Sequence, residues 1–221
     1  MEVVRNDFKD EWHLDPRIDA AAQMDNEHYK KSGGVENPLD RGHLVRRLDP
    51  CWGGTRDEVI KAHHDTFQYT NCAPQHMKFN RTQTLWGGVE DYILHNANSA
   101  DMRVTVFTGP VLRNDDPVYM APTGVQVQIP MEYWKVVVWV RDDGTLAAAG
   151  YLLSQSGHID SMLEVFEFGA YRQHQVAISE IEEVTDLSFR GLRDHDVFSS
   201  SHEALSGRRR HELHSMDDLI I

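Results

Sequence analysis

LDRGHLVRRLD, residues 39–49, is the stretch that decides the fold, and we interpret it as a short strand or extended segment. The next segment, TRDEVIKAHHD at 55–65, is predicted to form a short helix, because Thr55 and Glu58 have the spacing of a capping box. FQYTN at 67–71 alternates and carries aromatic and β-branched residues, which predicts a second strand. The sequence therefore predicts strand, helix and strand in this order.

The hydrophobic period changes after this second predicted strand. Between about residues 76 and 96, apolar residues recur every four positions at Leu85, Val89 and Ile93, which predicts a helix. The adjacent Trp86 is interpreted as a core residue.

Several β-rich segments follow, separated by short turns. They predict a mainly antiparallel sheet with a buried centre, to which 171–179 adds another strand and 178–189 a helix. We therefore expect an α+β fold over residues 1–198 and a polar, flexible tail over 199–221. The segments predicted to form the sheet are 102–112, 125–130, 133–140 and 145–155.

Composition excludes several classes of protein. Hydrophobic residues make up 40% of the 221 residues, so a sizeable core is feasible. No run of roughly eighteen apolar residues occurs, so no segment is expected to span a membrane. The first residues lack the apolar stretch of a signal peptide, so the expected location is the cytoplasm. Cys51 and Cys72 are expected to be free thiols, although a single bridge between them stays open.

Charge bears on what the protein binds. The formal net charge of −13 argues against attracting nucleic acid by overall electrostatics. Positive residues are nevertheless clustered, since Arg41, Arg46 and Arg47 fall together and Lys78 and Arg81 flank an asparagine. A nuclease needs to be basic only around its cleft, so this clustering keeps that function open.

His43 is the first candidate for chemistry. A histidine suits a general base, because its reference pKa of about 6.5 lies near working pH. Gly42 before it permits close approach of a phosphate backbone, and Arg41 can grip phosphate oxygens in a bidentate way. This trio points to phosphodiester chemistry.

Four short motifs, in order, resemble the DNA/RNA non-specific endonucleases, a family that includes endonuclease G. They are DRGH at 40–43, N-x-x-P-Q at 71–75, F-N at 79–80 and W-x-x-x-E at 86–90. The sequence is especially similar to a bacterial branch whose nuclease ends longer chains, often behind a trypsin-like protease domain. That similarity implies a longer multidomain protein.

The resemblance implies a ββα-metal finger on a mainly antiparallel sheet flanked by helices. It implies that His43 is the general base and that Asn80 is the sole direct protein ligand of Mg²⁺, with Mn²⁺ as a substitute. In the family pattern Glu90 orients water at the metal, and Asn71 and Arg41 lie near the phosphate. The substrates would be DNA and RNA, and the products would carry 5′-phosphate ends.

Other assignments complete this hypothesis. Arg46, Arg47 and Arg81 are candidate nucleic-acid contacts, and Asp40 is a supporting residue. Structural roles stay open for some of these residues. Asn71 could be a turn residue, and the arginines or Glu90 could be solvent-exposed surface residues without a role in the reaction. A homodimer stays open as well, because many family members dimerise. The rival function is an inactive nucleic-acid- or protein-binding module of the same fold.

Overall fold

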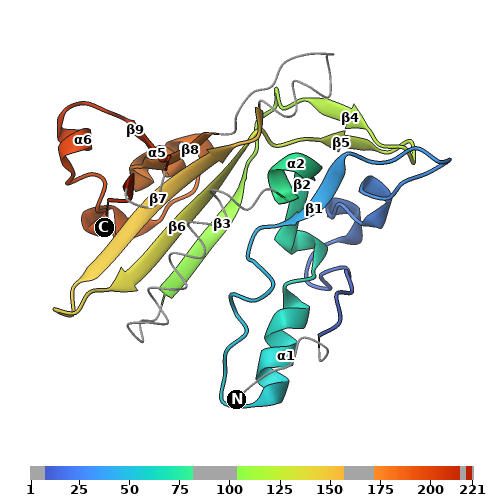
Figure 1. The fold of residues 1–221 in the computed structure, drawn as a ribbon, viewed down its shortest axis with the longest axis horizontal. Coiled ribbons are helices and arrows are strands. Elements are labelled where there is room, and N and C mark those ends of the chain that lie inside the picture. Colours follow the sequence, from blue (N-terminus) through green and yellow to red (C-terminus); the bar gives the residue numbers. More distant parts are fainter. Residues whose placement is uncertain (1–7, 82–103, 157–171, 215–217, 221) are drawn as a thin grey trace. The chain divides into compact units, whose positions relative to one another are not determined.

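The computed structural model describes residues 8–81, 104–156, 172–214 and 218–220 (Figure 1). The chain divides into two compact units. Residues 1–77 and 115–129 form the first unit, and residues 78–114 and 130–221 form the second.

The first unit contains the short ladder that carries the LDRGH segment. Strand β1 (Leu39–His43) pairs antiparallel with β2 (Cys72–His76), so that Leu39 lies opposite His76 and His43 opposite Cys72. Helix α1 (Arg56–Asp65) lies between them in the sequence. The predicted capping box at its start is confirmed, with Thr55 and Glu58 each bonding the other's backbone.

The prediction of a strand at 67–71 is wrong. Residues Tyr69–Asn71 form a 3-10 turn, η4, and the strand begins only at Cys72. The backbone N–H of Asn71 donates to the carbonyl of Gln68 at 2.8 Å, which closes the turn. Alternation of residue types did not reveal this local hydrogen bonding.

The strand predicted at 125–130 forms, but it does not join the large sheet. It is β5 (Gln126–Gln128), which pairs antiparallel with β4 (Val118–Met120) as a separate two-stranded hairpin in the first unit. A tight turn dictates this pairing, because Gly124 adopts a positive φ of 84° and donates its N–H to the carbonyl of Ala121 at 2.8 Å. Short 3-10 turns η2 (Ala20–Ala22) and η3 (Asn26–His28) complete the described elements of this unit.

The second unit is built on a five-stranded sheet of order β3-β6-β7-β8-β9, in which every neighbouring pair is antiparallel. Its strands confirm the segments predicted at 102–112, 133–140, 145–155 and 171–179. The α+β fold with mainly antiparallel sheets is therefore confirmed. The strands are β3 (Val104–Val111), β6 (Glu132–Val140), β7 (Leu146–Ser154), β8 (Arg172–Val176) and β9 (Arg210–Glu212).

Both faces of this sheet are covered. Helix α5 (Ile178–Thr185) packs on one face through Ile178 and Ile181, against buried residues of β6 and β7. It ends earlier than predicted, because Asp186 adopts a left-handed conformation with φ of 55°. Alternate residues of the same strands form a second cluster on the opposite face together with two residues from later in the chain. The strand residues are Val137, Ala147, Ala149 and Tyr151, and the later residues are Val197 and Leu213.

The segment after residue 198, predicted to be a flexible tail, instead carries defined elements. It contains helix α6 (His202–Leu205) and the edge strand β9, after the 3-10 helix η5 (Arg190–His195). The prediction from composition is wrong because the segment is polar overall, whereas its few apolar residues pack on the sheet. Leu213 is only 2% exposed, and its N–H donates to the carbonyl of Gln173 at 2.8 Å.

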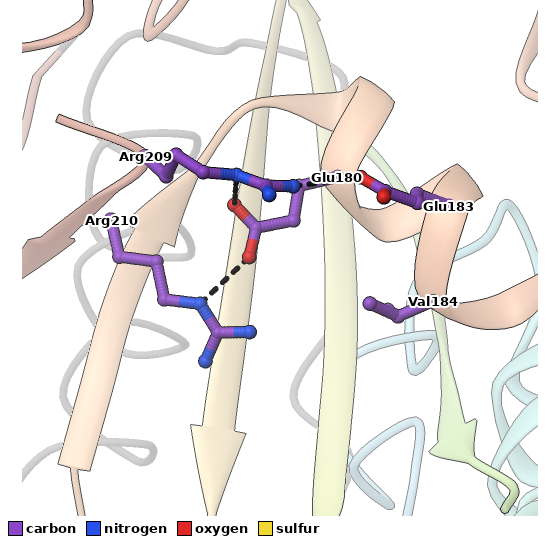
Figure 2. Close-up of a pocket in the computed structure, with 5 residues that line it drawn as sticks. All are labelled: Glu180, Glu183, Val184, Arg209 and Arg210. Atoms are coloured by element: carbon purple, nitrogen blue, oxygen red, sulfur yellow. Dashed lines mark hydrogen bonds and ion pairs between the residues drawn. The ribbon is translucent and has the colours of Figure 1, made fainter. Parts of the chain in front are cut away.

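Ion pairs also fasten this segment to α5. Residues Glu180, Glu183, Val184, Arg209 and Arg210 line an open pocket of about 570 Å³. In Figure 2, Arg209 and Arg210 both point toward Glu180. Nε of Arg210 donates to the buried carboxylate of Glu180 at 2.7 Å, and Nη2 of Arg209 donates to Glu183 at 2.7 Å. The guanidinium of Arg210 also reaches Glu132 at 3.1 Å. These two arginines therefore connect the C-terminal segment to α5 and β6.

Helix α2 (Met77–Arg81) follows β2 without a break, so β1, β2 and α2 form the expected ββα order. The rest of the helix predicted at 76–96, including Trp86, lies outside the described residues.

The two cysteines are free thiols, as predicted. Burial raises the pKa of the Cys72 thiol to about 12, so it stays protonated at neutral pH. Within the described ranges, no helix is long and apolar enough to cross a membrane.

Two leucines of the C-terminal segment provide a matched stability test. Leu213→Ala is expected to lower the free energy of unfolding by about 2–4 kcal/mol, because it empties a buried position. Leu205→Ala, at a position 78% exposed, is expected to cost less than about 0.5 kcal/mol. Urea denaturation followed by circular dichroism measures both. Equal, small effects would mean that the segment does not pack on the sheet.

Candidate active site

His43 ends β1 and is held between two aromatic rings of the first unit. Its ring centroid lies 4.6 Å from that of Trp12 and 4.9 Å from that of Phe67, which meets it edge-on. Its Nε2 atom is buried and has no hydrogen-bond partner among the described residues. Buried polar atoms are almost always hydrogen-bonded, so an unsatisfied ring nitrogen invites a functional explanation.

The protonation state of His43 follows from these surroundings. Burial lowers the pKa of the imidazole to about 4, and the nearby positive charge of Arg47 adds to that effect, while Asp10 opposes it. The ring is therefore neutral at physiological pH. A neutral imidazole with an unbonded nitrogen can accept a proton.

Arg41 lies beside this histidine and keeps its charge available. Its Nη1 donates to the side-chain oxygen of Asn26 at 3.0 Å, and its guanidinium carbon lies 5.5 Å from the centre of the Trp12 ring. In the part of the chain that the structure describes, no carboxylate pairs with it. Arg47, in contrast, donates to Asp10 at 3.2 Å.

Asn71 ties together the two segments that flank the site. Its side-chain oxygen accepts from the N–H of Val45 at 3.0 Å. Its side-chain nitrogen donates to the carbonyls of Val45 and Thr66, both at 2.9 Å. The carboxamide is thus committed to backbone groups, which fits a residue that positions the loop after β1.

Gly42 and Gln75 explain why two of the motifs occur together. A Cβ atom at residue 42 would lie 2.0 Å from Cδ of Gln75, whose side chain is only 4% exposed. The glycine is thus required by the residue that ends N-x-x-P-Q, two positions along the facing strand. Backbone strain is not the reason, because no positive φ occurs here.

The remaining predicted residues are more dispersed. Asp40 is half-buried in β1 opposite Gln75, and Arg46 lies 3.9 Å from Asp49. Asn80 is exposed in α2, and Arg81 is the last residue of that helix. Glu90 lies outside the described residues. The structure therefore brings His43, Arg41 and Asn71 together in the first unit.

Trp12 and Phe67 are site residues that the sequence did not single out. Phe67 fell in a segment predicted to be a strand. Trp12 stands in the polar segment WHLDPRI, where a lone tryptophan was a signal that could have been followed.

The donor set fits a hydrated magnesium ion. Among the residues that the structure describes, no group of three His, Cys, Asp or Glu side chains could hold a metal. Magnesium does not need such a cluster, because it retains several waters and is often bound through one or two protein oxygens. The exposed carboxamide of Asn80 offers a hard oxygen ligand of this kind.

Comparison with known families agrees with the motifs. The model of the DNA/RNA non-specific endonucleases matches residues 2–194, which is most of the chain. The chain belongs to this family.

Two individual proteins are similar to this endonuclease-family chain. It is 36% identical over 187 residues to the uncharacterized protein y4fB of Sinorhizobium fredii, and the match covers 81% of this chain and 27% of the relative. The chain therefore spans about a quarter of the length of that protein. A solved structure described as the EndoG/EndoGI complex shares the fold, with a TM-score of 0.55 and 20% identity over 88% of this chain and 76% of that one.

The contact between Gly42 and Gln75 in this endonuclease-family chain can be tested by a double-mutant cycle. Gly42→Ala is expected to cost about 1–3 kcal/mol of stability, because the new methyl group overlaps the buried glutamine. In a Gln75→Ala background the same change is expected to cost less than about 0.5 kcal/mol. Gly191→Ala is the control, since nothing lies within 4 Å of its added Cβ. Additive costs in the cycle would contradict the steric explanation.

Proposed function

We propose that this chain is a Mg²⁺-dependent, sugar-nonspecific endonuclease that hydrolyses phosphodiester bonds of DNA and RNA. The observation that carries the proposal is the Nε2 atom of His43, which is buried, unbonded among the described residues and neutral at physiological pH. Membership of the nuclease family supports it.

In this proposal His43 is the general base. Its Nε2 takes a proton from a water molecule, and the water oxygen forms a bond to phosphorus. The bond from phosphorus to the 3′ oxygen breaks, so the products carry 5′-phosphate and 3′-hydroxyl ends. Because water attacks rather than the ribose 2′-hydroxyl, both DNA and RNA are substrates.

The neighbours of His43 have complementary tasks. Arg41, which has no carboxylate partner in the described ranges, binds the scissile phosphate through charge-assisted hydrogen bonds. Asn71 hydrogen-bonds the backbone of Val45 and so holds His43 and Arg41 in position at the end of β1. Arg46, Arg47 and Arg81 bind flanking phosphates, while Asp40 and Glu90 support the centre.

Asn80 is the proposed protein ligand of the magnesium ion. When bound, the ion would neutralise charge that develops on the phosphate and on the leaving oxygen. Manganese, which also accepts oxygen ligands, would replace it.

The relative's length bears on the protein in which this chain works. Since the chain spans 27% of y4fB, we propose that it works as the nuclease portion of a longer protein.

The decisive experiment is digestion of plasmid DNA and of RNA, with and without EDTA, by wild type and by His43→Ala. Wild type is expected to cut both substrates only with free Mg²⁺. His43→Ala is expected to lose about 10²–10⁴-fold in rate, the usual contribution of a general base, while binding is unchanged. Binding is measured by fluorescence anisotropy of a labelled oligonucleotide in EDTA.

His202→Ala is the matched control, because His202 is exposed in α6, and it should cut like wild type. Equal loss of binding and rate in His43→Ala would contradict the role of the base. Bound but uncut substrate with wild type would favour an inactive binding module.

The pH dependence of the reaction follows from the partial burial of the His43 ring. Because the pKa of its imidazole is lowered to about 4, the base stays neutral well below the usual value of about 6.5. The rate is therefore expected to hold as pH falls from 8 to about 5 and to drop as pH passes through about 4. Measurement of kcat/KM, which reports the free enzyme, checks this. An acidic limb centred at or above pH 6.5 would refute it.

A further inference from the structure

A segment near the N-terminus, Phe8–His13, which we call the N-terminal strap, runs beside His43 within the first unit. Its backbone is fixed by hydrogen bonds at His13. The N–H of His13 donates to the carbonyl of Phe67, and its carbonyl accepts from the N–H of Tyr69, both at 3.0 Å. These bonds form an isolated parallel bridge to the turn that precedes β2. The backbone of the strap is thus anchored one residue away from Trp12.

The indole of Trp12 contacts the main candidate groups. Its ring centroid lies 4.6 Å from that of His43, 5.2 Å from Phe67 and 5.9 Å from Tyr69. The guanidinium carbon of Arg41 lies 5.5 Å from its ring centre, within the range of a cation–π interaction. One side chain therefore touches both the proposed base and the proposed phosphate ligand.

The start of the strap is anchored as well, through Phe8. The ring of Phe8 stacks on the buried His63 with centroids 4.1 Å apart, and His63 lies 5.0 Å from Phe67. Asp10 accepts from Arg47 at 3.2 Å and lies 3.6 Å from Nε2 of His63.

A further anchor follows the strap in the sequence. The carboxylate of Asp15, only 3% exposed, accepts a bidentate pair from Arg17 and a hydrogen bond from the hydroxyl of Thr70 at 3.1 Å. Thr70 directly precedes Asn71. The C-terminal end of the strap is therefore tied to the segment that holds the loop after β1.

We propose that Trp12 is a positioning residue, which fixes the orientation of the His43 ring and the Arg41 guanidinium through its indole ring and shields one face of the His43 ring from bulk water. A general base usually takes its orientation from a hydrogen-bonded third group. That bond is made by the ring nitrogen that does not take the proton, which leaves the other nitrogen, here the unbonded Nε2, for the reaction. The contacts that hold the His43 ring are its packing against Trp12 and Phe67, so we assign the orienting task to them. This inference rests on the proposed function, in which His43 is the base.

Removal of the indole changes the surroundings of His43 in a measurable way. Water reaches the ring face, so the largest cause of its lowered pKa is weakened. The charges that face the ring stay in place: Arg47, Arg41 and His63 oppose protonation, and Asp10 favours it. The pKa of His43 is therefore expected to rise toward the ordinary value of about 6.5.

The test compares Trp12→Ala, Trp12→Leu and Trp12→Phe with wild type in the full chain. Misplacing a reacting group by about 1 Å costs roughly 10²-fold, so Trp12→Ala is expected to lower kcat by about that factor while KM changes less than about threefold. Trp12→Phe, which keeps an aromatic face, is expected to recover most of the rate. The acidic limb of the pH profile is expected to move upward in Trp12→Ala and Trp12→Leu.

Two further measurements separate positioning from simple stability. NMR titration of the His43 ring gives its pKa without any substrate, and circular dichroism reports the folded fraction. Trp52→Ala is the matched control, because Trp52 is 78% exposed, and it should leave rate and titration unchanged. If Trp12→Ala does not fold, Trp12→Leu is read in its place.

Folded Trp12 variants with wild-type kcat per folded molecule and an unchanged His43 titration would overturn the inference. A wild-type protein that cuts no nucleic acid would instead overturn the proposed function. In that case the titration alone still decides whether Trp12 shields His43.

Discussion

The antiparallel register of β1 and β2 is the constraint on which the candidate site depends. It sets residues about thirty positions apart face to face, with His43 opposite Cys72. Gln75 then crosses the strand at Gly42, where only a hydrogen atom leaves room. A slip of one residue would turn each side chain of β1 to the other face, and the contacts of His43 with Trp12 and Phe67 would be lost. The geometry of the ladder is thus a matter of close packing as much as of hydrogen bonding.

Several of the described arginines pair with carboxylates of this chain. Arg17 binds the buried carboxylate of Asp15, Arg47 binds Asp10, and Arg210 bridges α5 and β6. This explains how a chain with a net charge of −13 can carry clustered positive residues without forming a broadly basic face. Arg41 differs, because its neighbours are an amide and an indole. Cation–π and neutral hydrogen-bonding contacts hold a guanidinium in place without cancelling its charge, so local attraction for phosphate persists in an acidic molecule.

The sequence predicted the fold where periodicity or capping was local. The strands of the second unit and the Thr55 capping box are examples. The prediction from the sequence is wrong where tertiary contacts determine the secondary structure. The segment at 67–71 turns because Asn71 bonds the backbone, and β5 follows its own hairpin rather than the large sheet. The motif residues His43 and Arg41 were found by resemblance. Trp12 was missed, because its packing against His43 is a tertiary contact, and the tryptophan in WHLDPRI indicates only that the residue packs somewhere.

Strand β9 lies beyond residue 194, where the match to the family model ends. It nevertheless occupies the outer position of the sheet beside β8. A gene fragment trimmed to the family boundary would leave the hydrogen-bonding groups of β8 open along one side, and it would uncover the apolar surface beneath Leu213. Open strand edges recruit strands from other molecules. A fragment for expression should therefore extend past the region that the family model matches, and self-association on trimming would be a sign of a lost edge rather than of a natural assembly.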